Sequence, residues 1–253
     1  MVLFHHYGRE YGGSLPSAYA SGSKIENETG LAVYLHLEPG RLVQADFTGE
    51  LFYYPGPRHL TLVPSYGQRY RLRIGNGALS KFQWKIGILR KLWQSTPEHG
   101  LPGPPPLRTS DLTRVDIRVA GFQVVHWQSR LLLSFLKESQ TSYPAYAAAQ
   151  QFSYQVFKQV KSALQFVVFD VQDWNNRFYL YEPGVYYSFN FPSLYGCGQK
   201  TTMVLSLKVL EKLSLASKIA FTVYRHKKNL GTANDLIPGN TKWSVEMQVR
   251  LNL

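Results

Sequence analysis

Apolar and polar residues alternate one by one over long stretches of this chain. In the last segment, apolar side chains occupy the odd positions from Trp243 to Leu253, and polar side chains occupy the even positions from Lys242 to Asn252. A period of two residues predicts a β-strand with one apolar and one polar face, because a helix would scatter the same residues around its circumference. The same alternation recurs in the segments 69–74, 81–88, 114–119, 202–209 and 213–223.

Further strands are predicted from residue type in the segments 31–37, 42–54, 127–137, 146–158, 164–173 and 178–191. The chain is therefore expected to form about twelve strands, or fourteen, of roughly 9–13 residues each. Strands of soluble proteins average roughly 5–6 residues, whereas strands that span a membrane need about 9–11. The strand length therefore favours a membrane protein.

The predicted connections alternate between short and long. Short connections are expected at 38–41, 75–77 and 211–212, and long ones at 55–67, 94–111 and 227–241. The segment 94–111 is so rich in proline and glycine that it can be neither strand nor helix. We therefore predict an all-β fold, an antiparallel up-and-down transmembrane β-barrel. Residues 1–253 are expected to form this single domain, with 1–26 as an N-terminal strand or loop.

Alternation alone does not say which face meets water, and a large soluble β-sandwich or barrel with an apolar core is the alternative. Aromatic residues near strand ends favour the membrane, where such residues form girdles at both interfaces. A closed sheet of twelve strands would also be too wide for side chains to fill, since about eight already fill one. The candidate interface aromatics are Trp84, Trp93, Trp127, Trp174, Tyr179, Tyr181, Tyr187 and Trp243.

Composition agrees with this interpretation. The 253 residues include 28 Lys and Arg against 16 Asp and Glu, giving a net charge of +12, yet only 17% are charged, below the roughly 25% of soluble domains. The surplus suits nucleic acid, an anionic membrane surface or a basic pore interior. The sequence contains no window of eighteen consecutive apolar residues, so no transmembrane helix is predicted. The first residues do not resemble a signal peptide.

Basic residues on the polar positions of the predicted strands are the main candidate functional set. If these residues line a basic lumen, the lumen would favour anions. If they are solvated arginines paired with scattered acidic residues, they would have no such function. The sequence is consistent with both interpretations. The candidate lumen-facing residues are Arg69, Arg71, Arg73, Lys81, Lys85, Arg114, Arg118 and Arg130.

No catalytic, cofactor or metal site is predicted. His5 and His6 would point to opposite faces of a strand and cannot easily share a metal. The single cysteine, Cys197, excludes an intrachain disulfide and a cysteine-based zinc cage. The acidic residues Asp170, Asp173 and Glu182 are expected to counter basic lumenal side chains, with Arg177 the nearest in sequence.

Several short strings together resemble a known family. They are Asn27–Leu31, Pro64–Gly67, Arg177–Glu182, Phe189–Pro192, Tyr195–Gly198 and Ile237–Thr241. In order and spacing they resemble the C-terminal β-barrel of the helix-hairpin-helix (competence-type) outer-membrane proteins of Gram-negative bacteria. The helix-hairpin-helix repeats are not in this sequence, and the last residue is Leu253 where such barrels usually end in an aromatic. The resemblance implies that the chain is the barrel portion of a longer protein.

The sequence thus predicts a non-enzymatic barrel of the Gram-negative outer membrane. It would act as a pore or membrane anchor with a basic lumen, associated with DNA uptake or handling through the resemblance. The expected partners are outer-membrane lipid and an anionic solute or DNA, and the expected state is a monomer. The alternative is a soluble basic β-protein that binds nucleic acid by aromatic stacking and backbone contacts.

Overall fold

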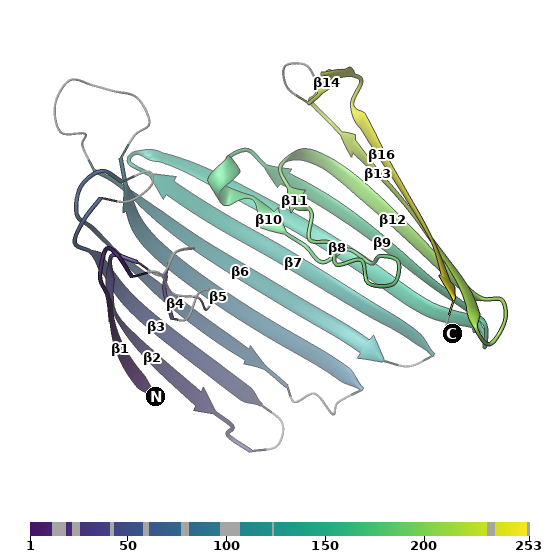
Figure 1. The fold of residues 1–253 in the computed structure, drawn as a ribbon, viewed down its shortest axis with the longest axis horizontal. Coiled ribbons are helices and arrows are strands. Elements are labelled where there is room, and N and C mark those ends of the chain that lie inside the picture. The colour runs from purple at the N-terminus through teal and green to yellow at the C-terminus, as the bar shows by residue number, and fades with distance from the viewer. Residues whose placement is uncertain are drawn as a thin grey trace. The chain divides into compact units, whose positions relative to one another are not determined.

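A computed structural model describes residues 1–11, 19–21, 26–40, 43–57, 61–76, 81–96, 107–122, 124–231 and 236–251. This part of the chain is almost entirely β-structure, with a single 3-10 turn at Trp174–Asn176 (Figure 1). The prediction of an all-β fold is therefore confirmed. The alanine-rich segment 144–151 lies within a strand. Within the described residues, no helix is long and apolar enough to cross a membrane.

The strands of the first half are Val2–Tyr7 (β1), Glu28–Leu37 (β2), Gln44–Tyr54 (β3), Ser65–Gly75 (β4), Phe82–Ser95 (β5), Arg108–Phe122 (β6) and Val125–Glu138 (β7). Those of the second half are Thr141–Phe157 (β8), Val160–Val171 (β9), Phe178–Tyr179 (β10), Ser193–Leu194 (β11), Gly196–Lys208 (β12), Leu213–Tyr224 (β13), Asn229–Leu230 (β14), Ile237–Pro238 (β15) and Thr241–Leu251 (β16).

Twelve strands form one sheet in the order β1-β2-β3-β4-β5-β6-β7-β8-β9-β12-β13-β16. Strands pair antiparallel in β1–β2, β2–β3, β3–β4, β4–β5, β8–β9, β9–β12, β12–β13 and β13–β16. The two-residue strands pair separately, β10 with β11 and β14 with β15. β1 and β16 end the order, and the described residues include no pairing between them. Closure into a barrel stays a prediction.

Connections between successive strands of the sheet alternate in length. Those of one edge lie at 38–43, 76–81, 123–124, 158–159 and 209–212, and those of the other at 8–27, 55–64, 96–107, 139–140, 172–195 and 225–240. All of the first set are short, and all of the second except 139–140 are long. The predicted alternation is thus present, with the 139–140 turn as its exception.

The described chain falls into two compact units. The first comprises Met1–Gly77, Lys85–Val115 and Ser134–Tyr143. Large apolar side chains on one face of its strands are exposed to solvent, and they are Leu31, Leu35, Leu37, Leu51, Tyr53, Tyr66, Tyr70, Ile86 and Ile88. The opposite face is polar at the edge with the short connections. At the edge with the long connections, Phe52 packs against Tyr54 on this face, with ring centroids 5.8 Å apart. This arrangement inverts the usual burial of apolar side chains.

The second unit comprises Ala78–Trp84, Asp116–Leu133 and Pro144–Leu253. Its strands also carry large apolar side chains on an exposed face, and they are Tyr146, Phe152, Leu164, Phe166, Met203, Leu205, Leu215, Ile219, Val245, Met247 and Val249. The alternate positions are small or polar and mostly buried, and they include Ala145, Ala147, Ala149, Gln165, Thr202, Lys218, Ala220 and Thr222. The two faces of these strands therefore differ in residue size as well as polarity.

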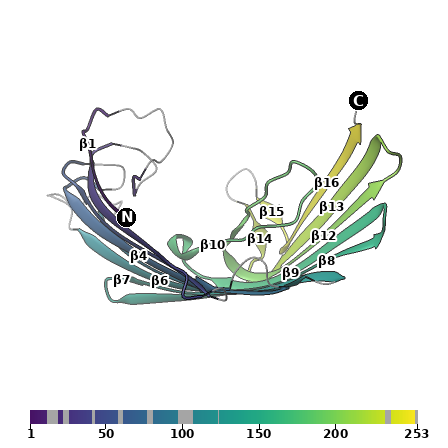
Figure 2. The same ribbon diagram turned by 90° about the horizontal axis from the view of Figure 1, so that it is seen from below.

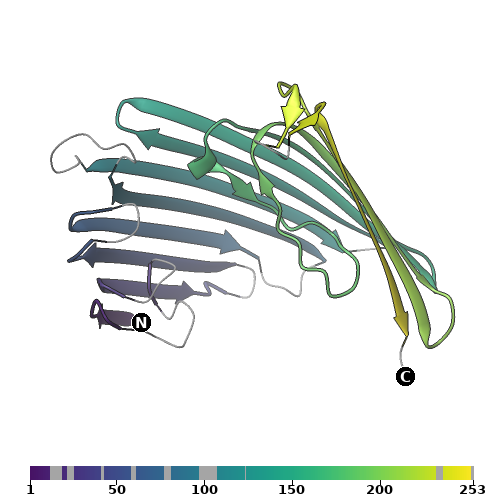
Figure 3. The same cartoon turned by 45° about the horizontal axis from the view of Figure 1, so that its top comes forward.

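Residues 172–195, which we call the inner segment, cover the small and polar face. Figures 2 and 3 show this segment, with β10 and β11, on one side of the sheet strands of the second unit. In the part of this unit that the structure describes, no element covers the exposed apolar face.

The prediction of a sheet strand over 178–191 is wrong, because only β10 and β11 pair there, outside the twelve-stranded sheet. The backbone of Phe178–Glu182 is nevertheless extended, with alternate side chains toward the sheet: Phe178, Leu180 and Glu182 are buried, and Tyr179 and Tyr181 are exposed. A two-residue period indicates an extended backbone that is packed on one side. Phe178–Glu182 has such a backbone but does not pair with the sheet. Pro183 and Pro192, which lack an N–H donor, do not favour a longer ladder.

Candidate functional site

The inner segment is held by an apolar contact at its start. Phe178 and Leu180 pack with Leu194 into a buried cluster that includes the alanines of β8 and Val167, Phe169 and Val171 of β9. Small side chains at Ala145, Ala147 and Ala149 leave room for the segment to approach the sheet, since interiors are close-packed. The row of alanines therefore explains why the segment lies on this face.

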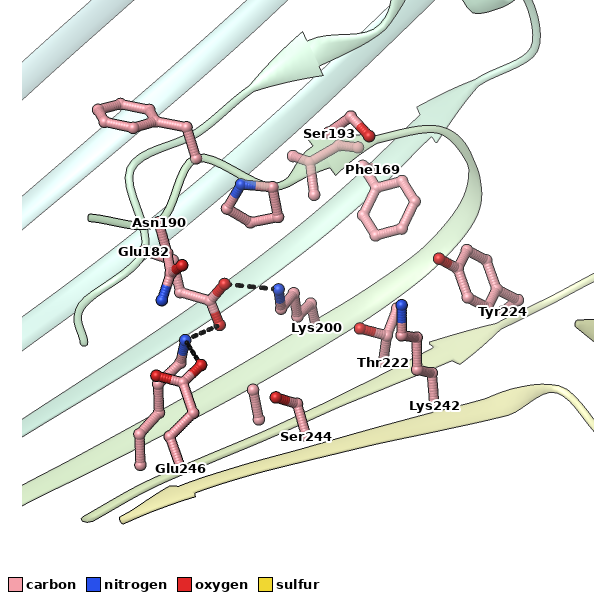
Figure 4. A pocket seen from close by; sticks show the side chains of 15 residues that line it. Phe169, Glu182, Asn190, Ser193, Lys200, Thr222, Tyr224, Lys242, Ser244 and Glu246 are labelled. Carbon is pink, nitrogen blue, oxygen red and sulfur yellow. Dashed lines mark hydrogen bonds and ion pairs between the residues drawn. The ribbon is translucent and has the colours of Figure 1, made fainter. Parts of the chain in front are cut away.

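An ion network follows directly after this apolar contact. The Glu182 carboxylate accepts hydrogen bonds from Lys200 Nζ at 2.7 Å and from Thr202 Oγ1 at 2.6 Å. Lys218 Nζ lies 3.8 Å from Glu182 Oε1 and donates to Glu246 Oε1 at 3.0 Å. Figure 4 shows Glu182 entering from the segment toward side chains that rise from the sheet. The network thus joins the inner segment to β12, β13 and β16.

Strand register explains why these side chains meet. Lys200 of β12 pairs with Thr222 of β13, which pairs with Lys242 of β16. Two residues further along the strands, Thr202 pairs with Ala220 and Ala220 with Ser244. One more step brings Val204, Lys218 and Glu246 into line. Successive rows on one face lie about 6.8 Å apart, so these rows form a compact polar patch.

Both central charges of the network are removed from water. Glu182 is 4% exposed and Lys218 is 3% exposed. A buried charge costs several kcal/mol unless it is paired and hydrogen-bonded, and both of these groups are. The segment's backbone is fixed beside them, because the Glu182 N–H donates to the Asn190 carbonyl oxygen at 3.1 Å. Glu182 is therefore the ionic link between the segment and the sheet.

Arg177 does not pair with Glu182, although it is the nearest basic residue in sequence. Its guanidinium lies over the Trp174 ring, 4.3 Å from the centroid, and donates to the Tyr179 hydroxyl at 2.6 Å. Alternation explains this, because residues 177 and 182 have opposite parity on an extended chain. The counter-ions of Glu182, Lys200 and Lys218, are distant in sequence.

A cavity of about 380 Å³ lies between the inner segment and the strands of the second unit. Its polar lining comes from Glu182, Asn190, Ser193, Lys200, Lys218, Thr222, Lys242, Ser244 and Glu246 (Figure 4). Its apolar lining comes from Phe169, Phe191, Pro192, Leu194, Ala220 and Tyr224. The volume is in the range of small-molecule sites, which combine apolar walls with a few convergent polar groups.

The predicted arginine ladder lies on the polar face of the first unit. Arg69, Arg71 and Arg73 pair in register with Glu50, Thr48 and Asp46 of β3. Arg69 donates to Glu50 at 2.9 Å and to the Ser21 carbonyl oxygen at 3.0 Å. Asp46 also accepts from the Tyr34 hydroxyl at 2.9 Å and contacts His36 Nδ1 at 2.7 Å. Acidic residues therefore lie beside this ladder.

The other predicted basic residues are distributed over both units. Arg118 and Arg130 converge on Asp116, at 2.6 and 2.9 Å, within the second unit. Arg114 donates to the buried Ser134 hydroxyl at 3.2 Å within the first.

Lys85 and Arg73 share the polar face, because Lys85 pairs with Gly75, two residues beyond Arg73 on β4. Lys81 lies just before β5. A role of these eight residues in lining a lumen stays a prediction.

The predicted interface aromatics divide into two groups. Trp127 lies 6.4 Å from Phe82, and Trp243 stacks on Phe221 at 5.2 Å; these two and Trp84 occupy apolar positions near strand ends. The remaining five lie elsewhere. Trp93 shares the face of Arg69, because it pairs with Gly67 of β4, and Trp174, Tyr179, Tyr181 and Tyr187 belong to the inner segment. Alternation predicts which face of a strand a side chain occupies. It does not predict whether the extended segment belongs to the sheet or, like the inner segment, lies on it.

A second buried polar cluster occurs in the first unit. The Glu28 carboxylate is fully buried and accepts from the Ser21 N–H at 2.9 Å and the Ser21 hydroxyl at 2.9 Å. His5 Nε2 lies 3.0 Å from the same carboxylate, and the Tyr54 hydroxyl is hydrogen-bonded to Ser21. The serine bonds the carboxylate directly and not the imidazole, so the order of a Ser–His–acid nucleophile is absent. This cluster joins β1, β2 and β3 structurally.

Among the described residues, no group of three or more His, Cys, Asp or Glu side chains is close enough to hold a metal ion. Sequence reasoning named Glu182 but missed Lys200, Lys218, Lys242 and Glu246. Their even positions predict that they lie on the polar face of the sheet. Which of them meet depends on the register of the strands, which the sequence does not specify. No family model matches the chain, and a search of curated proteins finds no match.

Proposed function

We propose that this protein is a transmembrane β-barrel of the Gram-negative outer membrane, without enzymatic chemistry, whose polar face lines a lumen that holds the inner segment. The observation that carries the proposal is the inversion of burial in the second unit. Leu205 and Phe166 are 40% and 42% exposed, whereas Glu182 and Lys218 are nearly fully buried on the other face. A monomeric soluble protein rarely exposes so large an apolar surface, and lipid would cover it.

Three further observations support a barrel. The sheet strands other than β1 are long, from Glu28–Leu37 to Thr141–Phe157, and membrane strands need about 9–11 residues. Apart from the 139–140 turn, short and long connections occupy opposite edges, as in outer-membrane barrels. Aromatic residues such as Trp127 and Trp243 lie at the ends of the apolar face, where membrane interfaces concentrate them. The resemblance to the helix-hairpin-helix outer-membrane family belongs to the same proposal.

A matched pair of substitutions tests the assignment of the faces. Leu205→Arg places a charge on the exposed apolar face, and Ser206→Arg places it one residue away on the polar face. Because an arginine on the lipid side costs about 2–4 kcal/mol near the bilayer centre, Leu205→Arg should lower the free energy of unfolding in lipid vesicles by that amount. Ser206→Arg should lower it by less than about 1 kcal/mol, as wet surface substitutions do.

Fractionation and gel mobility provide the first measurement. The wild-type protein should partition with outer membranes and migrate faster on SDS gels unheated than boiled. A monodisperse protein that dissolves without detergent would overturn the proposal and favour the soluble nucleic-acid binder. Equal losses for Leu205→Arg and Ser206→Arg would also contradict it.

Ion selectivity tests the pore within this proposal. Arg71 and Arg73 lie on the polar face of β4, and rings of basic side chains favour anions. Replacing both by Glu should shift the reversal potential of bilayer conductance toward cation preference. An unchanged potential would remove the basic-lumen part of the proposal and leave a membrane anchor.

A further inference from the structure

We propose that the cavity beneath the inner segment binds a small organic anion, with its carboxylate or phosphate group at Lys242, Thr222 and Ser244 and its apolar body between the segment and the sheet. This inference goes beyond the membrane role, because the site lies entirely within the second unit and does not require lipid.

The charges around the cavity do not cancel. Lys200, Lys218 and Lys242 line it together with only two acidic residues, Glu182 and Glu246. The acids are committed to Lys200 and Lys218, at 2.7 and 3.0 Å. Among the described residues, Lys242 has no acidic group within 4.0 Å. Lys242 is exposed to solvent, so one unpaired positive charge lies at the open side of the cavity, and an anion bound there would neutralise it.

Hydroxyl donors lie beside this ammonium group. Thr222 is the cross-strand partner of Lys242, and Ser244 follows two residues later on the same face of β16. Figure 4 shows Lys242 and Thr222 next to each other at one end of the cavity, with Ser244 between Lys242 and Glu246. Cross-strand partners lie about 5 Å apart at Cβ, so one anionic group can reach the ammonium and a hydroxyl together. Hydrogen bonds to charged groups are stronger than neutral ones.

Apolar walls define the rest of the ligand. From the sheet, Phe169 and Tyr224 contribute an edge-to-face pair with ring centroids 6.1 Å apart. From the inner segment, Phe191 and Pro192 line the same cavity. The Phe191 ring contacts those of Phe189 and Tyr181, whose centroids are 4.8 and 5.6 Å away. A flat apolar body would therefore contact aromatic surface contributed by both the sheet and the segment, and inorganic anions would leave this surface unused.

Three ligands that share a phenyl ring and differ in the charge of their polar group test the site. Benzoate, benzyl alcohol and benzylamine share one ring and are anionic, neutral and cationic. They are titrated by calorimetry into the full chain in a nonionic detergent, or in buffer if the chain dissolves without it. We expect the dissociation constant of benzoate to be at least about tenfold below those of the other two, because an ionic hydrogen bond contributes about that factor.

Substitutions locate the binding. Lys242→Gln should raise the dissociation constant of benzoate about tenfold and leave that of benzyl alcohol unchanged. Lys242→Arg, which keeps the charge, should retain the preference for benzoate. Lys208→Gln is the matched control, because Lys208 is an exposed lysine at the far end of β12 and does not line the cavity.

Equal affinities for the three ligands would overturn the proposal. So would a Lys242→Gln protein with unchanged benzoate affinity, or a Lys208→Gln protein that loses as much affinity as Lys242→Gln. These outcomes are independent of membrane insertion, which fractionation and the Leu205→Arg variant measure. Failure of the ligand site and failure of the barrel proposal are therefore distinguishable.

Discussion

Replacing Glu182 by Gln removes one negative charge from the ion network and keeps the length and shape of the side chain. Lys200 loses its acidic partner at 2.7 Å, and Lys218 keeps only Glu246, at 3.0 Å. Lys200 and Lys218 have side chains that are 14% and 4% exposed, so water replaces the lost partner poorly. The variant therefore leaves buried positive charge incompletely compensated.

The cost follows from the burial of the network. Removing one partner of a buried ion pair costs about 3–5 kcal/mol, because the other charge stays in a low-dielectric environment. The variant keeps Glu246 beside Lys218 and an amide that can still bond Thr202. The expected loss of stabilising free energy is therefore about 3 kcal/mol. This loss is expected in the docking of residues 172–195, and it corresponds to roughly a hundredfold increase in the open population of the segment.

Amide hydrogen exchange of the detergent-solubilised protein measures this opening directly. The Glu182 N–H, which donates to the Asn190 carbonyl at 3.1 Å, reports it locally, and the amides of β9 and β13 serve as the reference. Exchange at position 182 should accelerate about a hundredfold in Glu182→Gln and remain unchanged in the reference strands. Adding Lys200→Met should recover part of the loss, since it removes the unpaired cation.

A change of less than about threefold at position 182 would refute the assignment of Glu182 as the ionic link, because surface ion pairs contribute about that little. Equal acceleration in the reference strands would also refute it, since the whole sheet would then have opened. No recovery on adding Lys200→Met would show that charge burial is not the cause.

Three further substitutions test other contacts. Phe178→Ala should weaken docking of the segment by about 3–5 kcal/mol, seen as faster tryptic cleavage after the half-buried Arg177, and unchanged cleavage would contradict the packing described. Gly67→Ala should lower the free energy of unfolding by about 1–3 kcal/mol, measured by urea titration. The added Cβ would meet the Phe52 ring and a carbonyl oxygen 2.8 Å away. Asp116→Asn should cost about 2 kcal/mol by the same titration, since it removes the acid shared by two arginines, and a neutral result would show that solvent already screens this cluster.

The class of the fold was predictable because alternation is a local property. Residues 242–252 alternate in sequence, and β16 displays Val245 and Met247 on one face and Glu246 and Gln248 toward the other. Exposure of the apolar face was not contained in the pattern, which is symmetric between a soluble core and a lipid surface. The features that favour a lipid surface are the aromatic residues near strand ends and the width of a closed twelve-stranded sheet.

The candidate site was only partly predictable, for a physical reason. Glu182 and Lys200 are eighteen positions apart, and Lys218 and Glu246 are twenty-eight apart. Their meeting depends on the register of β12, β13 and β16, which one sequence does not specify. Residues 178–191 resemble a sheet strand in sequence because the extended backbone of Phe178–Glu182 buries every second side chain, as a strand does. Pro183, Gly184 and Pro192 are the signals that distinguish it.

The position of the inner segment between β9 and β12 has a consequence for the order of assembly. Its apolar start docks on Ala145 and Ala147 of β8 and on β9, which precede it in the chain. Its carboxylate binds lysines of β12 and β13, which follow it. Phe178 therefore packs on strands that precede it, whereas the counter-ions of Glu182 lie on strands that follow it. If the chain docks in that order, Phe178 should have a high φ-value and Glu182 a low one. Pairing of β12 is then also the event that gives Glu182 its hydrogen-bond partners, Lys200 and Thr202, and a chain arrested before β12 would carry the segment without its ionic link to the sheet.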